Sequence, residues 1–515
     1  MGLFAETIGQ YKSTLYETAR NLLQSRNTQR ARAHELAEQN RELKLQKEQL
    51  VAQLREAEER QDRAQQQIHQ QQQEIEELRR QPITLPSDLP LPHHTYGPRM
   101  ISLCLNLCKE VGFRPAETAL RIICDWMGVK VDIPSFDAIR VWACRVGVAQ
   151  LQSSIERDDW IWLVDHSNQI GQEKVLQIIG IRVKDLPPLG ETLPLEKMHV
   201  LATIPGTSWT RDDVRREYKT LAERIGPPKY LLCDGAVELR ESADVLEIEG
   251  ETPVVLRDMK HYAANVFEQL IGKDERFQEY LSKLGRTRSA VQQTELSHFT
   301  PPPQKPKARF MNLGPTLRWG SMISYHLSNS RSKSRQGIAA QRVNDKLGWM
   351  RDFRDELAVW RRCEEVMQAS LGFINRHGVY RGVAAKMETE LAGVRAEHPP
   401  GCELSATMAS KLIAFVADSE AQLGEGDRAW LSTENLESLF GRYKRLEGQH
   451  SKGGFTSLLA ALPMLLTNWT PALVRESLTK VSVKEMRAWV QDALGPTLAS
   501  RRVTAYQESA AAGYG

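Results

Sequence analysis

The sequence lacks any closely paired cysteine motif. It has seven cysteines, an odd number, and no two of them are separated by only two residues. This pattern argues against a disulfide framework and against a zinc ribbon, and it fits a reducing compartment. We therefore expect a cytoplasmic protein, in the bacterial cytoplasm or nucleoid. The cysteines are Cys104, Cys108, Cys124, Cys144, Cys233, Cys363 and Cys402.

Net charge and uninterrupted apolar sequence are also scarce. The net charge is only +3 over 515 residues, so nucleic-acid affinity must come from local patches. Residues 1–15 lack the basic start and apolar core of a signal peptide. The most apolar stretch, residues 455–474, contains Pro463, Asn468 and Pro471. These residues favour buried helices and turns over a membrane span.

The N-terminal region, residues 1–80, is predicted to hold a short helix followed by a coiled coil. From about residue 31 to residue 80 there is no glycine or proline, and apolar residues recur through seven heptads. Asn40 and Lys47 occupy core positions, which favours a dimer in fixed register. The alternatives are a lone solvated helix and a disordered glutamine-rich tract. The heptad d positions are Leu36, Leu43, Leu50, Ala57, Ala64, Gln71 and Leu78.

A proline-rich linker at 81–98 precedes three predicted helices at 99–152. The third of these helices opens with Pro134-Ser135, a helix-start signal. Three short helices in this order are typical of a helix-turn-helix domain, whose last helix would enter a DNA major groove. In that interpretation Arg140 and Arg145 face the DNA. The alternative is a small three-helix unit that makes no DNA contact.

Residues 155–261 change to the pattern of a sheet. Three strand-like runs, a helix capped by Thr210, and two further strand-like runs follow one another. This order predicts an RNase H-like mixed sheet. The fold class is therefore multidomain α/β plus α. The remaining predicted parts are an all-helical insertion at 262–430, a final catalytic helix at 431–450 and a C-terminal helical tail at 451–515.

Two predicted strands end in an aspartate, WIWLVD at Asp165 and KYLLCD at Asp234. Aspartate often ends a strand only because it suits a turn. In an RNase H-like sheet, however, the first and fourth strands are adjacent, so the two carboxylates would be neighbours. Neighbouring carboxylates repel unless a cation lies between them, and a hard ion with oxygen ligands, Mg²⁺ or Mn²⁺, suits them. A third carboxylate would complete a site for two such ions.

The third carboxylate is predicted on the helix LSTENLESLFGRYKRL. Glu437, Gly441 and Lys444 share one face of this helix, opposite an apolar face. Glu434 is the competing candidate, but it lies where it can interact with the helix N-terminus. We therefore prefer Glu437 as the metal ligand.

Across about residues 155–450 the sequence resembles the DDE transposases with an RNase H-like core. LVDHS and LLCDG match the strand-end aspartates, and STENLESLFGRYK is similar to the terminal helix of the family. Asn435, Glu437 and Lys444 stand at its motif places, with Asn435 one residue nearer the glutamate than in the Mutator form. In LRDMKH, Asp258 and His261 resemble the C/D-x-x-H motif of Mutator and hAT-type transposases.

Asp234 and Glu437 are 203 residues apart, which is too long for a simple helix crossover. A helical insertion between the last strand and the final helix, as those families have, would explain this length. Arg318-Trp319 is similar to an Arg-Trp pair of hAT-like insertions whose ring stacks on a flipped base. A tryptophan packed in a helical core is the alternative. Nearby residues form either a phosphate-binding stripe or a solvated loop. They are Arg331, Lys333 and Arg335.

The resemblance implies a DNA transposase, and the coiled coil predicts that it is a dimer. Asp165, Asp234 and Glu437 would hold two Mg²⁺ or Mn²⁺ ions, cleave transposon-end phosphodiesters and join the 3′-OH to target DNA. Asp258, His261 and Asn435 would support the site, and double-stranded DNA would be the partner. The alternatives are an RNase H-like nuclease without strand transfer and a domesticated, non-catalytic coiled-coil DNA-binding protein.

Overall fold

The computed structural model describes residues 15–80, 88–154, 158–166, 169–170, 173–247, 252–304, 310, 313–328, 340–396, 402–447, 455–496 and 498–511. The chain divides into two compact units, residues 1–87 and residues 88–515. The predicted loop residues Arg331, Lys333 and Arg335, and residues 81–87 of the predicted linker at 81–98, lie outside the described residues.

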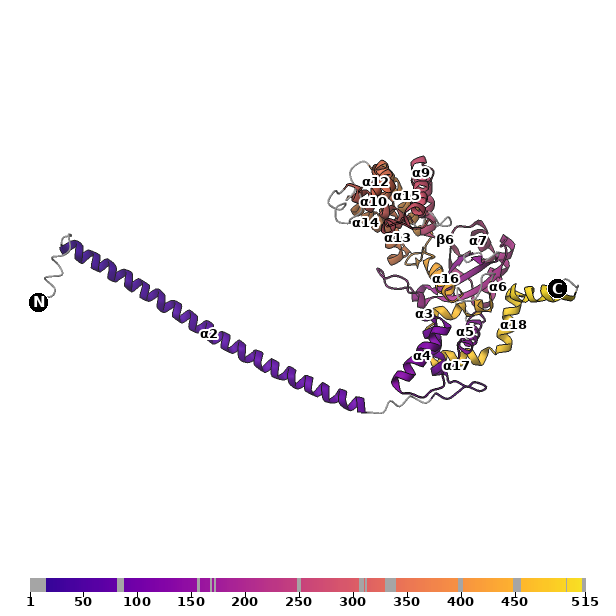
Figure 1. The fold of residues 1–515 in the computed structure, drawn as a ribbon, viewed down its shortest axis with the longest axis horizontal. Coiled ribbons are helices and arrows are strands. Elements are labelled where there is room, and N and C mark those ends of the chain that lie inside the picture. Colours follow the sequence, from indigo (N-terminus) through magenta and orange to yellow (C-terminus); the bar gives the residue numbers. More distant parts are fainter. Residues whose placement is uncertain are drawn as a thin grey trace. The chain divides into compact units, whose positions relative to one another are not determined.

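The first unit consists of one long helix, α2 (Leu15–Arg80), which Figure 1 draws without a break. The predicted helix from residue 31 to residue 80 is confirmed, but the helix already begins at Leu15. Leu36, Leu43 and Leu50 are 57–64% exposed. An exposed apolar stripe of this spacing is what a partner helix would cover, and the dimer stays a prediction.

The centre of the second unit is a mixed sheet. β1 lies between β3, which is antiparallel to it, and β5, which is parallel to it. Apart from the two-residue β2, the order across the sheet is third, second, first, fourth, fifth in chain order. The predicted adjacency of the first and fourth strands is therefore confirmed. The described strands of this sheet are β1 (Trp160–Asp165), β2 (Gln169–Ile170), β3 (Glu173–Arg182), β4 (His199–Gly206), β5 (Pro228–Cys233) and β6 (Val254–Arg257).

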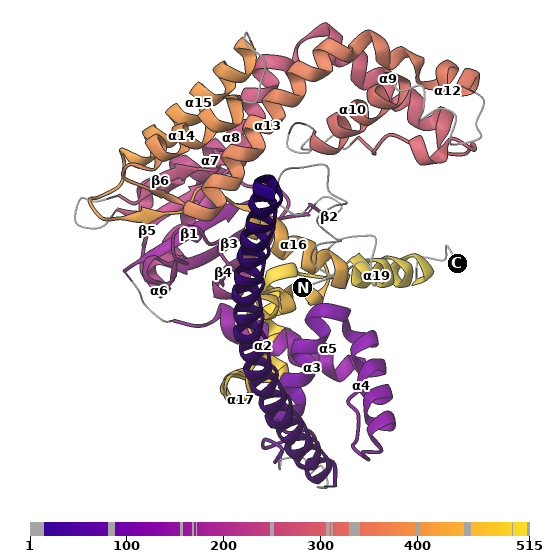
Figure 2. The ribbon, with the colours of Figure 1, turned by 90° about the vertical axis from the view of Figure 1, so that its left-hand side faces the viewer.

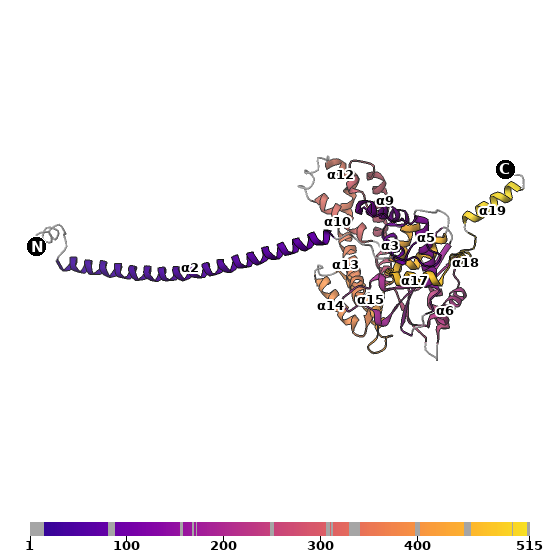
Figure 3. The ribbon, with the colours of Figure 1, turned by 90° about the horizontal axis from the view of Figure 1, so that it is seen from below.

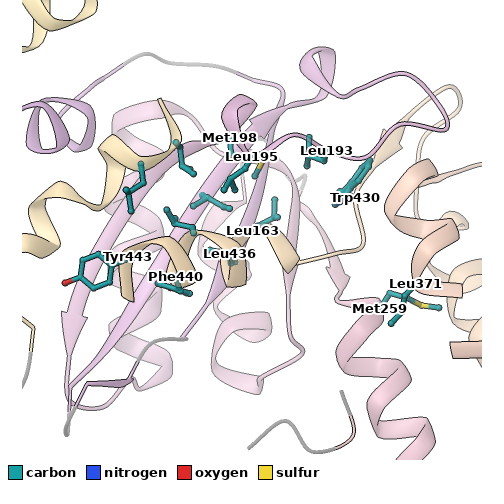
Figure 4. Packing of buried hydrophobic residues seen from close by; sticks show 14 of the residues in the cluster. Leu163, Leu193, Leu195, Met198, Met259, Leu371, Trp430, Leu436, Phe440 and Tyr443 are labelled. Atoms are coloured by element: carbon teal, nitrogen blue, oxygen red, sulfur yellow. The ribbon is translucent and has the colours of Figure 1, made fainter. Parts of the chain in front are cut away.

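Both faces of this sheet are covered, because alternate residues of each strand point to opposite sides. On one face Trp162 and Val164 pack with Tyr218 of α6 (Arg211–Ile225). On the other face Leu163 packs in the same cluster as Phe440 of α16 (Glu434–Glu447). Figure 4 shows α16 lying along this face of the sheet. The predicted cap of α6 is confirmed, since the Thr210 side chain accepts a hydrogen bond from the Asp213 N–H.

The region between β6 and α16 is mostly helical, as predicted. Figure 2 shows α13, α14 and α15 side by side. A two-stranded pair of β7 (Val379–Tyr380) with β8 (Arg428–Ala429) was not predicted. The described helices of this region are α8 (Met259–Phe267), α9 (Glu275–Val291), α10 (Gly314–Ser328), α12 (Ala340–Leu347), α13 (Arg354–His377), α14 (Val383–Ala396) and α15 (Glu403–Glu420).

The three helices predicted as a helix-turn-helix domain pack against the C-terminal segment. Figure 3 shows α17 beside α3 and α5. Every residue of α5 from Trp142 to Ala149 is buried, and a Cβ at Gly147 would clash with the carbonyl oxygen of Ala460. The elements are α3 (Pro98–Val111), α4 (Phe113–Met127), α5 (Phe136–Leu151), the 3₁₀ segment η8 (Ser457–Leu466), α17 (Pro471–Lys480), α18 (Val483–Leu494) and α19 (Leu498–Ala511).

This packing corrects two predictions. A recognition helix must present an open face to the groove, but α5 is buried from Trp142 to Ala149, so this part of it cannot contact DNA as predicted. The segments predicted as a separate domain at 99–152 and a separate tail at 451–515 share one core. For example, the Lys109 ammonium donates to the carbonyl oxygen of Thr467 at 2.7 Å.

The apolar stretch at 455–474 forms buried helical structure, as predicted, with residues 458–466 all buried. Among the described residues, no helix is both long enough and apolar enough to cross a membrane. All seven cysteines are free thiols, and five of them are buried.

Candidate active site

The candidate site lies where three parallel strands end at the same edge of the sheet. Val164 of β1 is paired with Cys233 of β5, and Cys233 is paired with Arg257 of β6. Each of these three residues is followed by an aspartate: Asp165, Asp234 and Asp258. The register therefore places three acidic residues in a row at the carboxyl end of adjacent strands, which is where α/β sheets present functional side chains.

Asp258 is fully committed to bonds within the protein. Its side chain is 1% exposed. One carboxylate oxygen accepts from the backbone N–H and the ring Nδ1 of His261, at 2.7 and 2.9 Å. The other accepts from the backbone N–H and the hydroxyl of Thr433, at 2.6 and 2.9 Å. Asp258 thereby ties the end of β6 to the start of α8 and to the residue that precedes α16.

This bonding changes the pKa values of both members of the pair. Burial, the largest single cause, raises the pKa of Asp258, but the hydrogen bonds and charge of His261 and the Thr433 N–H together outweigh it and lower the pKa. Burial, the largest single cause, lowers the pKa of His261, but the hydrogen bond and charge of Asp258 and the charges of other carboxylates together outweigh it and raise the pKa. These other carboxylates are Asp234 and Asp165, so His261 shares a corner of the sheet with both of them.

Asp165 and Asp234 are both partly buried and are therefore less enclosed than Asp258. Asp234 Oδ1 accepts a hydrogen bond from the Ala236 N–H at 2.8 Å, which holds the turn after β5. Gly235 in this turn has φ +96°, a conformation that favours glycine. The two carboxylates project from adjacent strand ends, so the predicted pairing of these aspartates has its structural basis in the strand register.

Next to Asp165, His166 belongs to a small aromatic cluster. Its ring stacks on Trp209, with ring centroids 6.2 Å apart. Its Nδ1 lies 3.3 Å from a carboxylate oxygen of Glu238. Burial lowers the pKa of His166, against the opposing charges of Glu238 and Asp234. A neutral ring at this position adds no positive charge to the edge that carries Asp165.

Glu437 faces this corner from α16, but it is engaged by a lysine. As predicted, Glu437, Gly441 and Lys444 are exposed, whereas the apolar face of α16 is buried. Lys260 Nζ lies 2.8 Å from Glu437 Oε2 and 3.5 Å from Glu434 Oε1. Glu434 Oε2 also accepts a hydrogen bond from the Asn375 amide at 2.7 Å. Asn435 is partly buried.

These residues fit a hard divalent cation in chemical kind. Asp165 and Asp234 supply carboxylate oxygens from adjacent strands, which is the donor type that Mg²⁺ and Mn²⁺ prefer. Within the described ranges, however, no three or more His, Cys, Asp or Glu side chains are grouped closely enough to hold a metal ion. A three-carboxylate site therefore requires the carboxylates to come closer together, and in this structure Glu437 is paired with Lys260.

The two arginines predicted on the third helix have different environments. Arg145 is 6% exposed, and its guanidinium donates to the carbonyl oxygens of Val481 and Leu478, both at 2.8 Å. It joins α5 to the C-terminal helices and is not available to DNA, which corrects that prediction. Arg140 is 41% exposed and lies 3.4 Å from Asp137.

Arg318 and Trp319, predicted as a DNA-binding pair in the insertion, also have different environments. Trp319 is 7% exposed, and its indole N–H donates to the carbonyl oxygen of Phe299 at 2.9 Å. Its ring is packed in the core of the insertion, which agrees with the alternative of a core tryptophan and leaves the ring closed to a flipped base. Arg318 has 59% of its side chain exposed and lies 3.8 Å from the buried carboxylate of Glu364.

Three residues of the site were not predicted: Lys260, Thr433 and Asn375. Lys260 lies within the LRDMKH motif and Thr433 within the STENLES run, so both were inside sequences already singled out. Their contacts cross 175 and 177 residues of sequence. No periodicity signal reports a pairing at such separations, and Asn375 lies in a plain amphipathic helix.

No protein-family model matches the chain, and no curated protein matches it. Several solved structures do match. One is a Drosophila P element transposase strand transfer complex, 11% identical, with a TM-score of 0.39, which covers 75% of this chain and 94% of that chain. Identity and TM-score are too low to assign a fold or a function. The function has to be inferred from the residues of the chain itself.

Proposed function

We propose that the protein is a DNA transposase that cleaves transposon-end phosphodiesters and joins the freed 3′-OH to target DNA. The observation that carries the proposal is the row of strand ends. Asp165 and Asp234 follow directly paired residues of two parallel strands, and α16 with Glu437 is tied to the same corner through Asp258. This arrangement supports an RNase H-like core with an Asp, Asp, Glu site.

The sheet order gives further support. The sequence of third, second, first, fourth and fifth strands, with only the second antiparallel to its neighbours on both sides, suits an RNase H-like sheet. The long helical region between β6 and α16 corresponds to the insertion that the resemblance implied. The continuous α2, with its exposed leucines, supports dimerisation as a way to bring two DNA ends together.

The residues of the site would have separate roles. Asp165, Asp234 and Glu437 would hold two Mg²⁺ or Mn²⁺ ions, which supply activation of the attacking oxygen and stabilisation of the leaving oxygen when bound. Asp258 fixes α16 against the sheet. His261, whose pKa is raised, would offer a positive charge or a hydrogen bond to a DNA phosphate. Lys444, exposed two turns after Glu437, would contact the phosphate backbone.

Phosphoryl transfer asks little covalent chemistry of the protein, so positioning and charge neutralisation account for most of the proposed catalysis. The exposed arginines Arg140 and Arg318 would add contacts to phosphates. Binding through such contacts should weaken steeply as salt concentration rises.

A strand-transfer assay with full-length protein, Mg²⁺ and DNA from both sides of the gene tests the proposal. Joined products support a transposase, cleavage alone supports a nuclease, and binding without either supports a non-catalytic DNA-binding protein. Asp165→Asn and Asp234→Asn should abolish the products and leave DNA binding unchanged. Asp345→Asn, at an exposed position of α12, is the matched control and should behave as wild type.

A further inference from the structure

Lys260 contacts both glutamates of α16 and follows Asp258, at the carboxylate edge of the sheet, by two residues. It is the second residue of α8, whose start is fixed by Asp258. Only 15% of its side chain is exposed, so its ammonium is held in place. Its Nζ lies 2.8 Å from Glu437 and 3.5 Å from Glu434. One positive charge is therefore shared by two carboxylates, of which one is the proposed third metal ligand.

We propose that Lys260 is a positioning residue that holds Glu437 away from the two aspartates and releases it when a divalent cation binds. This proposal rests on the proposed function, because it concerns the third ligand of the same site. Lys260 and the cation both seek the Glu437 carboxylate, so each binds at the expense of the other.

Glu434 makes this exchange possible. The Asn375 amide of α13 fixes one Glu434 oxygen at 2.7 Å, and the other oxygen faces Lys260. When Glu437 turns to the cation, Lys260 keeps Glu434 as its partner and is not left as a buried, unpaired charge. Glu437, with 44% of its side chain exposed, has room to change its rotamer.

A purely structural ion pair would behave differently. Loss of a structural pair would loosen α16 and weaken cation binding, whereas loss of a competitor strengthens it. The sign of the change in cation affinity therefore separates the two roles. Partly exposed ion pairs have modest strength, so we expect about a threefold effect.

The test measures Mn²⁺ binding to the full-length protein by calorimetry, without DNA. Lys260→Met should lower the Kd about threefold, and Lys260→Arg should leave it near the wild-type value. In a Glu437→Gln background, Lys260→Met should cause no further change. In the matched Glu434→Gln background it should still tighten binding. Lys260→Gln repeats the neutral substitution, so the proposal can still be judged if the methionine variant does not fold.

Unchanged or weaker Mn²⁺ binding in both neutral variants overturns the proposal, and so does a tightening that persists undiminished in the Glu437→Gln background. Its failure is separable from that of the proposed function. If strand transfer is metal-dependent but the Lys260 variants do not tighten Mn²⁺ binding, only the proposed role of Lys260 is overturned. If the variants show the expected Mn²⁺ affinities but the protein cleaves no DNA, only the proposed transposase function is overturned. If the wild-type protein shows no Mn²⁺ binding that is lost on substitution of Asp165 and Asp234, both proposals are overturned.

Discussion

Asp234 and Asp258 occupy equivalent places on neighbouring strands, yet their surroundings differ sharply. Both follow a residue of the paired set Cys233 and Arg257. Asp258 is 1% exposed and accepts four hydrogen bonds from His261 and Thr433. Asp234 is partly buried, and a backbone N–H in its own turn donates to it.

The difference separates a structural carboxylate from one suited to chemistry. A buried carboxylate whose oxygens are both occupied by donors fixes the chain and has little capacity left for a ligand. A carboxylate held by a short local turn keeps its orientation and retains lone pairs. Position at a strand end is therefore not enough to identify a functional aspartate, and the hydrogen-bond partners decide between the two roles.

The largest expected effect is the loss of DNA cleavage in the Asp234→Asn variant. Loss of a metal-ligand charge should reduce the cleavage rate about 10³-fold or more, since such ions contribute several kcal/mol to transition-state stabilisation. The free energy of unfolding should change by less than about 1 kcal/mol, because few interactions are lost. Mg²⁺-dependent cleavage and urea unfolding measure the two quantities. A variant that cleaves at the wild-type rate would remove Asp234 from the site.

For Asp258→Asn we expect a large loss in the free energy of unfolding, in contrast to Asp234→Asn. An amide cannot accept four hydrogen bonds, so buried donors of His261 and Thr433 would be left unpaired, which costs about 2–4 kcal/mol of stability. The urea midpoint of the tryptophan fluorescence transition measures this loss, with Asp234→Asn as the control. A loss as small as that of the control would show that Asp258 does not hold α16 in place.

His261 sharpens the comparison through pH. Its folded pKa is raised, so the stability it contributes is fully present below its unfolded pKa of about 6.5 and is lost as pH rises through the folded pKa. His261→Gln should therefore cost most near pH 5.5, by about 1 kcal/mol, and least near pH 9. Thermal unfolding across this range measures it, with the exposed His34→Gln as control. A cost that grows with pH would contradict the ion pair.

A similar contrast between a buried and a half-exposed side chain exists in α5, where we expect smaller changes in the free energy of unfolding. Arg145→Met leaves the carbonyl oxygens of Val481 and Leu478 without their donor and should destabilise the protein by about 1–3 kcal/mol. Arg140→Met, at a half-exposed site beside Asp137, should cost no more than about 0.5 kcal/mol. Urea unfolding of both variants compares them directly. Equal costs would mean that the buried guanidinium is not a tie between α5 and the C-terminal helices.

The sheet and α16 could be predicted from the sequence because their patterns are local. Alternating and continuous apolar runs gave the strands that end at Asp165 and Asp234, and their adjacency is confirmed by the register. The period of α16 separated its exposed face, with Glu437 and Lys444, from its buried face. Local patterns report which sides of an element are covered. The continuous apolar runs indicate strands buried on both faces, and the helical period of α16 indicates one buried face.

The errors arose where distant segments cover an element. α5 shows helical spacing with two arginines that local reasoning places in solvent, but helices more than 300 residues later in the chain enclose it. Trp319 follows an exposed arginine, yet the carbonyl oxygen of Phe299 receives its N–H. The bond between Lys260 and Glu437 spans 177 residues. Such contacts depend on tertiary placement, which no short pattern encodes.

The continuity of α2 gives the protein a ruler. With a rise of about 1.5 Å per residue, a helix of 66 residues is about 100 Å long. Measured along duplex DNA at about 3.4 Å per base pair, that length equals about 29 base pairs. If two copies pair along this helix, the distance between the two ends of the paired helix is set by backbone geometry, and deleting whole heptads would shorten it in steps of about 10 Å.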